Sequence, residues 1–385
     1  MSRIVTSGFE TPFSPTEEGW ETWDGTAGTE ASSWESGGRR LWDGGDSASV
    51  RREVGGAYYL KVRNDNAALS RAFKRNIGPA VSEAWGRFAF NDEGFIRRPN
   101  ARIFEWHLNG IGLIAEIQER DIAASTFGVK LVGPSNQLIK DNGTQFIRGS
   151  EGVWSLAEWH IKLAGSDGRF ELWWDGVKRI DYTGPLAGPG GETVFDAVIV
   201  GQGASQGTTP ASPRGYDDIA INDVSGTVNN GRIGDGVILN LRPVTPGTTT
   251  QLLSDLGAAA PHNFSRVSRD EDPNGFVGTD VPGSKDTYRM GGLLEETSLP
   301  TTHGSFPSLL LAAKAVQNGP AVSNIRYSIT PGGGAEIQEP AAPGLPLSTT
   351  ALAPTPHIVD GNSNSGDAFA HDEVVGIELG FSLEA

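Results

Sequence analysis

Short runs in which apolar and polar residues alternate follow one another along most of the chain. An alternation with a period of two places one set of side chains on each face of a β-strand. Six such runs precede residue 142, at 58–63, 85–90, 101–106, 113–119, 127–132 and 137–140. Apolar residues with helical spacing are nearly absent, and the best helical candidate, 305–317, can equally be a buried strand. The pattern therefore predicts an all-β protein.

A three-strand meander is predicted between residues 159 and 182. Strands at 159–164, 169–174 and 177–182 are separated by two turn signals, Ser166-Asp167-Gly168 and Asp175-Gly176. Asp-Gly pairs favour tight hairpin turns, because both central positions of such a turn take positive φ angles. Further strands are expected at 197–201 and 216–223.

Residues 225–236 contain four glycines and no apolar period, which indicates a connector between two domains. We therefore place a first domain at 1–225, a linker at 226–236 and a second domain at 237–385. Strand patterns at 237–243, 324–329 and 374–384 indicate that the second domain is also built from strands. The expected fold class is all-β, with two β-sandwich, jelly-roll-like domains joined by a Gly-rich linker.

Composition agrees with this class and argues against several functions. The chain has 52 glycines and 23 prolines for turns, and ten tryptophans and sixteen phenylalanines for packed cores. It has no cysteine, which excludes disulfides, thiolate metal sites and cysteine nucleophiles. The formal net charge of −16 argues against nucleic-acid binding, which depends on clustered cations. No apolar run approaches the ~20 residues needed to cross a bilayer, so we expect no membrane insertion.

The block 159–223 resembles the closing strands of concanavalin-A-like (laminin-G-like, pentraxin-like) jelly rolls. The matching features are a strand that begins at Trp159, an aromatic-rich stretch at 168–176, and the segment 199–221, which ends in Tyr216-Asp217-Asp218-Ile219-Ala220-Ile221. The resemblance covers residues 1–225 and implies a jelly roll for the first domain.

The whole arrangement also resembles a group of bacteriophage virion proteins. The shared features are Gly8-Phe9-Glu10-Thr11, Tyr216-Asp217-Asp218-Ile219, and Gly234-Asp235 followed by Ile238. The Pro/Gly-rich stretch 331–346 departs from the pattern. The resemblance implies a structural component of a phage virion, tail-attached or capsid-decorating, assembled in the host cytoplasm as a homo-oligomer that contacts other virion proteins. The alternative is a carbohydrate-binding adhesin or depolymerase module that recognises a host-surface glycan.

Carboxylate spacing argues against a glycosidase. On one strand, two carboxylates share a face when their numbers differ by two or four. Glu116 and Glu119 differ by three, and Glu171 shares a face with Asp175, which lies in a predicted turn. The six histidines show no metal-ligand spacing, and no Gly-x-Ser-x-Gly motif accompanies them. We therefore expect no enzyme, no catalytic residues, no cofactor and no resident metal.

Calcium-binding oxygens and exposed aromatic rings are the remaining candidates. Asp217, Asp218 and the acidic stretch 270–274 carry oxygens of the kind that Ca²⁺ prefers, although a strand anchor and a solvated loop are the favoured interpretations. Four tryptophans in a polar, Gly-rich N-terminal stretch are candidates for stacking on a sugar or filling a partner's pocket, and the favoured alternative is packing in the core of their own domain. They are Trp20, Trp23, Trp34 and Trp42.

Overall fold

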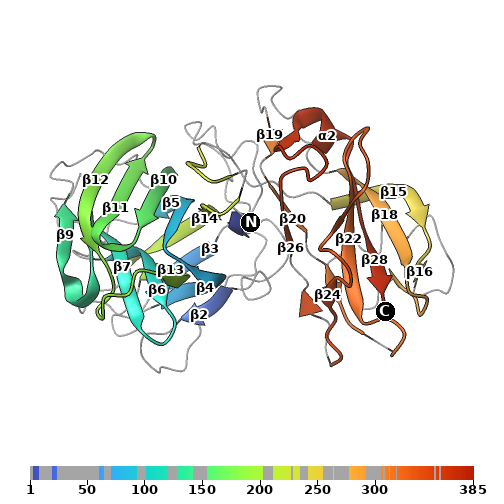
Figure 1. The fold of residues 1–385 in the computed structure, drawn as a ribbon, viewed down its shortest axis with the longest axis horizontal. Coiled ribbons are helices and arrows are strands. Elements are labelled where there is room, and N and C mark those ends of the chain that lie inside the picture. The colour runs from blue at the N-terminus through green and yellow to red at the C-terminus, as the bar shows by residue number, and fades with distance from the viewer. Residues whose placement is uncertain are drawn as a thin grey trace. The chain divides into compact units, whose positions relative to one another are not determined.

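The structure is a computed structural model, and it describes residues 3–7, 20–23, 60–64, 71–92, 101–119, 128–141, 154–202, 211–226, 229–234, 242–254, 263, 277–291, 305–306, 308–311, 313–317, 319–350, 353–354 and 357–385. The chain divides into two compact units, Met1–Ile238 and Leu239–Ala385, and each is described by itself. Strands make up most of the described residues in both units (Figure 1), which confirms the predicted all-β class. In the described part of the chain, no helix is both long enough and apolar enough to cross a membrane.

In its described residues, the first unit is a sandwich of two seven-stranded antiparallel sheets (Figure 1, blue to yellow-green). The first sheet has the order β1-β14-β5-β10-β11-β12, with β3 also paired to β14, and the second has the order β2-β4-β13-β6-β7-β8-β9. Strands far apart in sequence, such as β5 and β14, are therefore neighbours, as in a jelly roll. The bounds in the first sheet are β1 Arg3–Ser7, β3 Leu60–Asn64, β5 Glu83–Asp92, β10 Ser155–Lys162, β11 Ala164–Trp174, β12 Val177–Leu186 and β14 Ala211–Asp223. Those in the second are β2 Trp20–Trp23, β4 Arg71–Val81, β6 Arg102–Leu108, β7 Gly112–Glu119, β8 Val129–Val132, β9 Leu138–Asp141 and β13 Phe195–Gln202, with a 3-10 turn η1 at Pro134–Asn136.

The predicted meander is confirmed as β10, β11 and β12. Asp175 and Gly176 have φ angles of 51° and 78°, the left-handed pair that a two-residue hairpin favours. The first predicted turn takes a different form. β10 pairs with β11 only as far as Lys162, while Ala164 and Gly168 pair with β12. This stretch therefore extends β11 beyond the end of β10, because β12 supplies hydrogen-bond partners that a tight turn would not use.

Aromatic rings from both sheets fill the core of the first unit. The rings of Phe88 and Phe104 stack with centroids 5.1 Å apart, and Trp106 meets Trp159 edge to face at 5.0 Å. Gly86 lies opposite Trp159 in the β5–β10 register. A Cβ at this glycine would lie 2.1 Å from the indole, so its absence makes room for the ring.

The described part of the second unit is built around a six-stranded sheet of order β15-β18-β28-β22-β23, with β24 paired to β22 (Figure 1, yellow to red). Short two-stranded sheets supply side chains that cover one face of it: Leu309, Val359 and Phe369 cluster with Tyr327 and Ile329 of β22. The bounds are β15 Arg242–Thr250, β16 Leu253–Ser254, β17 Val277–Gly278, β18 Ser284–Gly291, β19 Ser305–Phe306, β20 Ser308–Leu311, β21 Lys314–Ala315, β22 Asn324–Thr330, β23 Ile337–Glu339, β24 Leu345–Pro346, β25 Ala353–Pro354, β26 His357–Asp360, β27 Phe369–Ala370, α2 His371–Val375 and β28 Glu378–Glu384.

Two predictions for this unit are resolved by the structure. The ambiguous segment 305–317 contains β19, β20 and β21, so its strand alternative is confirmed. The strand predicted at 374–384 begins only at Glu378, and the short helix α2 precedes it. The helix forms there because the Glu373 carboxylate accepts the backbone N–H of Ala370 at 2.8 Å, which caps its first turn. Residues 237–241 lie outside the described residues.

Candidate functional site

One face of the second sheet points away from the core and carries titratable side chains. On β6, Glu105 and His107 alternate with residues of the core, and on β7 Glu116 and Gln118 do the same. Glu105 lies directly opposite Glu116 in the β6–β7 register. Four polar side chains from two neighbouring strands thus meet on one surface.

Glu105 and Glu116, which we call the carboxylate pair, have side chains that are only 2% and 0% exposed. One guanidinium contacts both: Arg102 nitrogens lie 3.4 Å from Glu105 Oε2 and 2.8 Å from Glu116 Oε2. His107 Nε2 lies 2.8 Å from Glu105 Oε2, and Gln118 donates to Glu116 Oε1. Burial, and after it the charge of Glu105, raises the pKa of Glu116 to about 7, against smaller opposing effects of Arg102 and Gln118.

A network of polar side chains continues across the same face toward the edge strand β2. We call these residues the polar row: Glu21 on β2, Lys74 and Asn76 on β4, Asp196 on β13, and Asn109 in the β6–β7 turn. The amide of Asn109 donates to Asn76 Oδ1 at 3.1 Å, and the amide of Asn76 donates to Glu21 Oε1 at 3.0 Å. Lys74 donates to Asn109 Oδ1, and Asp196 accepts the backbone N–H of Asn109 at 2.8 Å. Each member is therefore held by another.

The β6–β7 turn positions Asn109. The N–H of Ile111 donates to the carbonyl of Leu108 at 3.0 Å, which closes the turn. Gly110 takes a φ of 81°, a left-handed conformation that costs glycine little. Because His107 precedes Asn109 by two residues, the carboxylate pair and the polar row are joined along β6.

The two parts of this face suit different chemistry. Glu21, Asn76 and Asn109 in the polar row are exposed, and their carboxylate and amide groups are donors and acceptors that match sugar hydroxyls. The carboxylate pair is withdrawn from solvent, so it is not placed to touch a substrate bound at the surface.

The outward face of the first sheet carries a second polar cluster. The ring of His160 stacks on Trp85 with centroids 4.1 Å apart and planes 10° apart. Its two nitrogens lie 3.2 Å from Glu171 Oε2 and 2.9 Å from Glu83 Oε1. The imidazole and the two carboxylates are polar partners of one another, so we attribute the cluster to stabilisation of the sheet.

Residues 229–234, inside the predicted linker, lie on this same face. Arg232 forms an ion pair with Glu158 on β10. The N–H of Gly234 donates to Glu158 Oε1 at 2.8 Å, and Arg87 donates to the carbonyl of Gly234 at 3.2 Å. The described part of the predicted linker is therefore anchored to the first unit.

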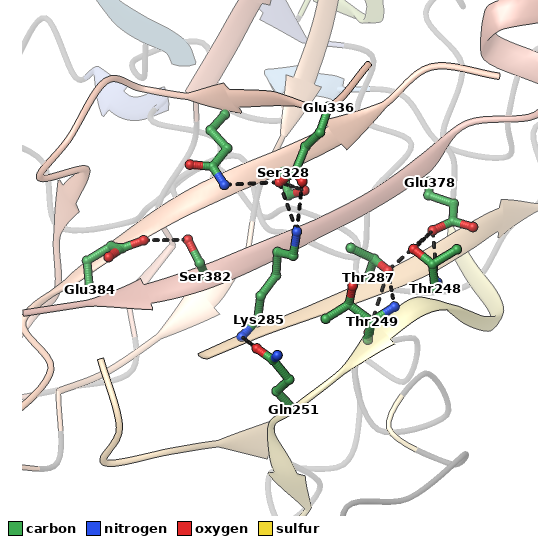
Figure 2. Close-up of polar contacts among 11 residues, drawn as sticks. Thr248, Thr249, Gln251, Lys285, Thr287, Ser328, Glu336, Glu378, Ser382 and Glu384 are labelled. Atoms are coloured by element: carbon green, nitrogen blue, oxygen red, sulfur yellow. Dashed lines mark hydrogen bonds and ion pairs between the residues drawn. The ribbon is translucent and has the colours of Figure 1, made fainter. Parts of the chain in front are cut away.

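The polar face of the sheet in the second unit is shown in Figure 2. Lys285 on β18 lies 2.8 and 3.0 Å from the two carboxylate oxygens of Glu336, and Ser328 and Gln338 donate to the same carboxylate at 2.8 and 3.0 Å. Although burial raises the pKa of Glu336, these donors outweigh it and hold the pKa below its ordinary value. These hydrogen bonds and the ion pair of Glu336 are all made within the second unit, so a structural role explains this carboxylate.

The structure places the four candidate tryptophans differently. Trp20 is 1% exposed and belongs to the core of the first unit, so packing explains it and its ring is not available for stacking on a ligand. Trp23 lies in β2, but its side chain is outside what the structure describes, as are Trp34 and Trp42. A binding role for these three stays a prediction.

The candidate calcium ligands that the structure describes act within the fold. Asp217 is buried, and its carboxylate accepts the backbone N–H of Asp218 at 2.7 Å. Asp218 has a φ of 49° at an irregularity of β14, where the register with β5 shifts. Residues 270–274 lie outside the described residues, and among those described no group of three or more His, Asp or Glu side chains is arranged to hold a metal ion.

Sequence reasoning missed the carboxylate pair because a β-bulge creates it. A regular hairpin continued from Leu108 opposite Gly112 would pair Glu105 with Ala115 and turn Glu116 to the core face. The register shifts by one residue between Trp106 and His107, which brings Glu116 opposite Glu105. The alternation of acidic and apolar residues on both strands was the only sequence signal for this pair. The register shift that brings the two glutamates together leaves no mark in the sequence pattern.

No protein family model matches the chain, and no curated protein matches it. Several solved structures resemble parts of it. The alginate lyase Aly36B is 14% identical, with 43% of this chain and 80% of that chain covered at a TM-score of 0.35. The cellulose induced protein Cip1 is 13% identical, with 60% and 100% covered at a TM-score of 0.41. The carbohydrate recognition domain of Emp47p is 9% identical, with 57% and 94% covered at a TM-score of 0.34. Likeness at this level does not carry a function to this chain.

Proposed function

We propose that the first unit binds a carbohydrate at the polar row. The observation that carries this proposal is the exposed amide pair of Asn76 and Asn109, held by mutual hydrogen bonding and by Glu21 and Asp196. Amide groups fixed before a ligand arrives lose little conformational freedom on binding, and each offers both a donor and an acceptor to sugar hydroxyls. The proposed activity is binding without cleavage, because the carboxylate pair on the same face is buried.

A glycan array followed by titration calorimetry on the bound glycan tests this proposal. We expect N76A and N109A each to weaken binding by about tenfold or more, the effect of about 1.4 kcal/mol of lost hydrogen bonding. N230A is the matched control, because Asn230 is an exposed asparagine of the same unit whose amide donates to the carbonyl of Gly226. Its affinity should equal that of the wild type. The proposal fails if no glycan binds, or if N76A and N109A bind as the wild type does.

A second candidate function is that of a structural component of a bacteriophage particle, tail-attached or capsid-decorating. It is supported by the resemblance carried by Gly8-Phe9-Glu10-Thr11 and Tyr216-Asp217-Asp218-Ile219, and it is compatible with sugar binding on a particle surface. We expect a homo-oligomer, since particle proteins are placed around symmetry axes. Electron microscopy of phage particles labelled with an antibody against this chain tests the idea. Absence of the chain from purified phage particles would refute it.

A further inference from the structure

Glu105 and Glu116 carry more negative charge than the permanent cation beside them neutralises. They are direct cross-strand partners, a relation that places their Cβ atoms about 5 Å apart on one face of the sheet. Both carboxylates contact the single guanidinium of Arg102. Two buried like charges this close favour a state in which one of them holds a proton.

Among the residues that the structure describes, the other groups around the carboxylate pair do not remove this imbalance. The residues directly opposite the pair on its outer flanks are apolar: Ile199 on β13 and Val132 on β8. Lys130 on β8 acts on Glu116 from a distance, with the smallest of the effects that lower its pKa. Lys74, one strand further away on β4, donates to the polar row. His107 Nε2 contacts Glu105, so an effect of the imidazole must be separated from that of the carboxylate pair.

The pair is coupled to the polar row through the β6–β7 hairpin. Glu105 and His107 lie on β6, one arm of this hairpin, Asn109 follows in the turn, and Glu116 lies on the other arm. When both carboxylates are ionised, their repulsion acts to separate the two arms. The turn that joins the arms carries Asn109, so the same repulsion disturbs the amide that orients the polar row.

We propose that Glu105 and Glu116 bind a single proton between them near neutral pH, and that release of this proton weakens both the first unit and the polar row, so that sugar binding falls as the pH rises. The part that concerns sugar binding rests on the proposed function, and the part that concerns the proton does not. Glu116 has a folded pKa of about 7 against an ordinary value of 4.5. Its contribution to stability is therefore fully present below the ordinary value and is lost as the pH rises through about 7.

Unfolding of the full chain followed by tryptophan fluorescence tests the proton site. All ten tryptophans precede residue 175, so this signal reports on the first unit alone. We expect the unfolding temperature of the wild type to fall as the pH rises from about 4.5 to about 7, and to level off above that. E116Q carries a neutral amide in place of the protonated acid, so its profile should be flat over that range. H107Q is the control for the imidazole and should keep the fall.

Two results would overturn the proton site: a wild-type profile that is flat between about pH 4.5 and pH 7, and a fall that E116Q keeps but H107Q loses. If E116Q does not fold, E105Q replaces it, because removing either carboxylate removes the repulsion. Carboxyl ¹³C resonances of the wild type give an independent reading. A glutamate that titrates near pH 7 supports the site, and a chain in which no glutamate titrates near pH 7 contradicts it.

Sugar binding at about pH 6 and about pH 8 tests the coupling, on the glycan identified for the polar row. We expect the wild type to lose affinity by at least about fivefold at the higher pH, and E116Q to change little. Equal wild-type affinity at both pH values refutes the coupling. A chain that binds no glycan, yet unfolds with the expected pH dependence, refutes the proposed function and leaves the proton site standing.

Discussion

Gly86 determines how the indole of Trp159 fits into the core of the first unit. A Cβ at this position would lie 2.1 Å from the ring, well inside van der Waals contact. We expect G86A to lower the free energy of unfolding of the first unit by about 3 kcal/mol or more, because a densely packed core leaves a large ring little room to move. Urea unfolding followed by tryptophan fluorescence measures the loss.

The matched control for this substitution is G165A. Gly165 lies on β11 of the same sheet, and a Cβ there would have no atom within 4 Å. Its unfolding curve should differ from that of the wild type by well under 1 kcal/mol, as for most surface changes. Similar losses for G86A and G165A would show that the destabilisation comes from glycine replacement in general and not from the fit around Trp159.

At the scale of the element, Glu158 anchors the segment 229–234 to the first sheet. Its carboxylate contacts both Arg232 and the backbone N–H of Gly234. We expect E158A to speed tryptic cleavage after Arg232, because a protease requires a locally released backbone and this substitution removes both contacts. Mass spectrometry of the early fragments gives the rate.

The control for this prediction is K162A, also on β10. Lys162 donates to Asp167 on an exposed part of β11, away from residues 229–234. Cleavage after Arg232 in K162A should proceed as in the wild type. If E158A is cleaved there no faster than the wild type, the contacts of Glu158 do not hold the segment in solution.

In the second unit, the ion pair of Lys285 and Glu336 crosses the sheet and links β18 to the residues before β23 (Figure 2). The pKa of Glu336 is lowered in the folded state, so its contribution to stability is present above its ordinary value of 4.5 and is lost as the pH falls through the lowered value. We expect E336Q to unfold at a lower temperature than the wild type at neutral pH, and to lose less stability on acidification. Tryptophan fluorescence reports on the first unit alone, so the unfolding of the second unit is measured by calorimetry.

E384Q, which changes a glutamate on β28 of the same sheet, is the control for E336Q. Glu384 accepts a hydrogen bond from Ser382 at 2.7 Å. Its variant should keep the acid-dependent loss of the wild type. The assignment to Glu336 is wrong if E336Q and the wild type lose stability in parallel between about pH 5 and pH 3.

At the scale of the whole molecule, each unit has hydrophobic clusters of its own. Among the described residues, one cluster is confined to the first unit and two to the second. We expect residues 1–238 produced alone to show the same fluorescence-detected unfolding as the full chain, and residues 239–385 to give the second calorimetric transition, because each unit buries its own core. A single cooperative transition of the full chain, lost in both fragments, would contradict this.

The sequence by itself determined the all-β class and many of the strands. The alternation of apolar and polar residues with a period of two depends only on local backbone geometry, so it predicted β5 to β8 and β22 well. The Asp175-Gly176 turn was predicted for the same reason, since a residue's tolerance of positive φ is a local property. The end of the chain was predicted less well, because the capping of α2 by Glu373 competes with the strand pattern there.

Only the tertiary structure decided which residues face one another. Trp20 belongs to the core because β2 pairs with β4, an association between distant segments that a polar N-terminal stretch does not reveal. The polar row depends likewise on contacts among β2, β4, β13 and the β6–β7 turn. Glu105 and Glu116 meet because the hairpin register shifts by one residue between Trp106 and His107, and a second shift between Arg102 and Phe104 ends the altered register. A bulge reflects packing against neighbouring strands, so local sequence does not determine where it falls.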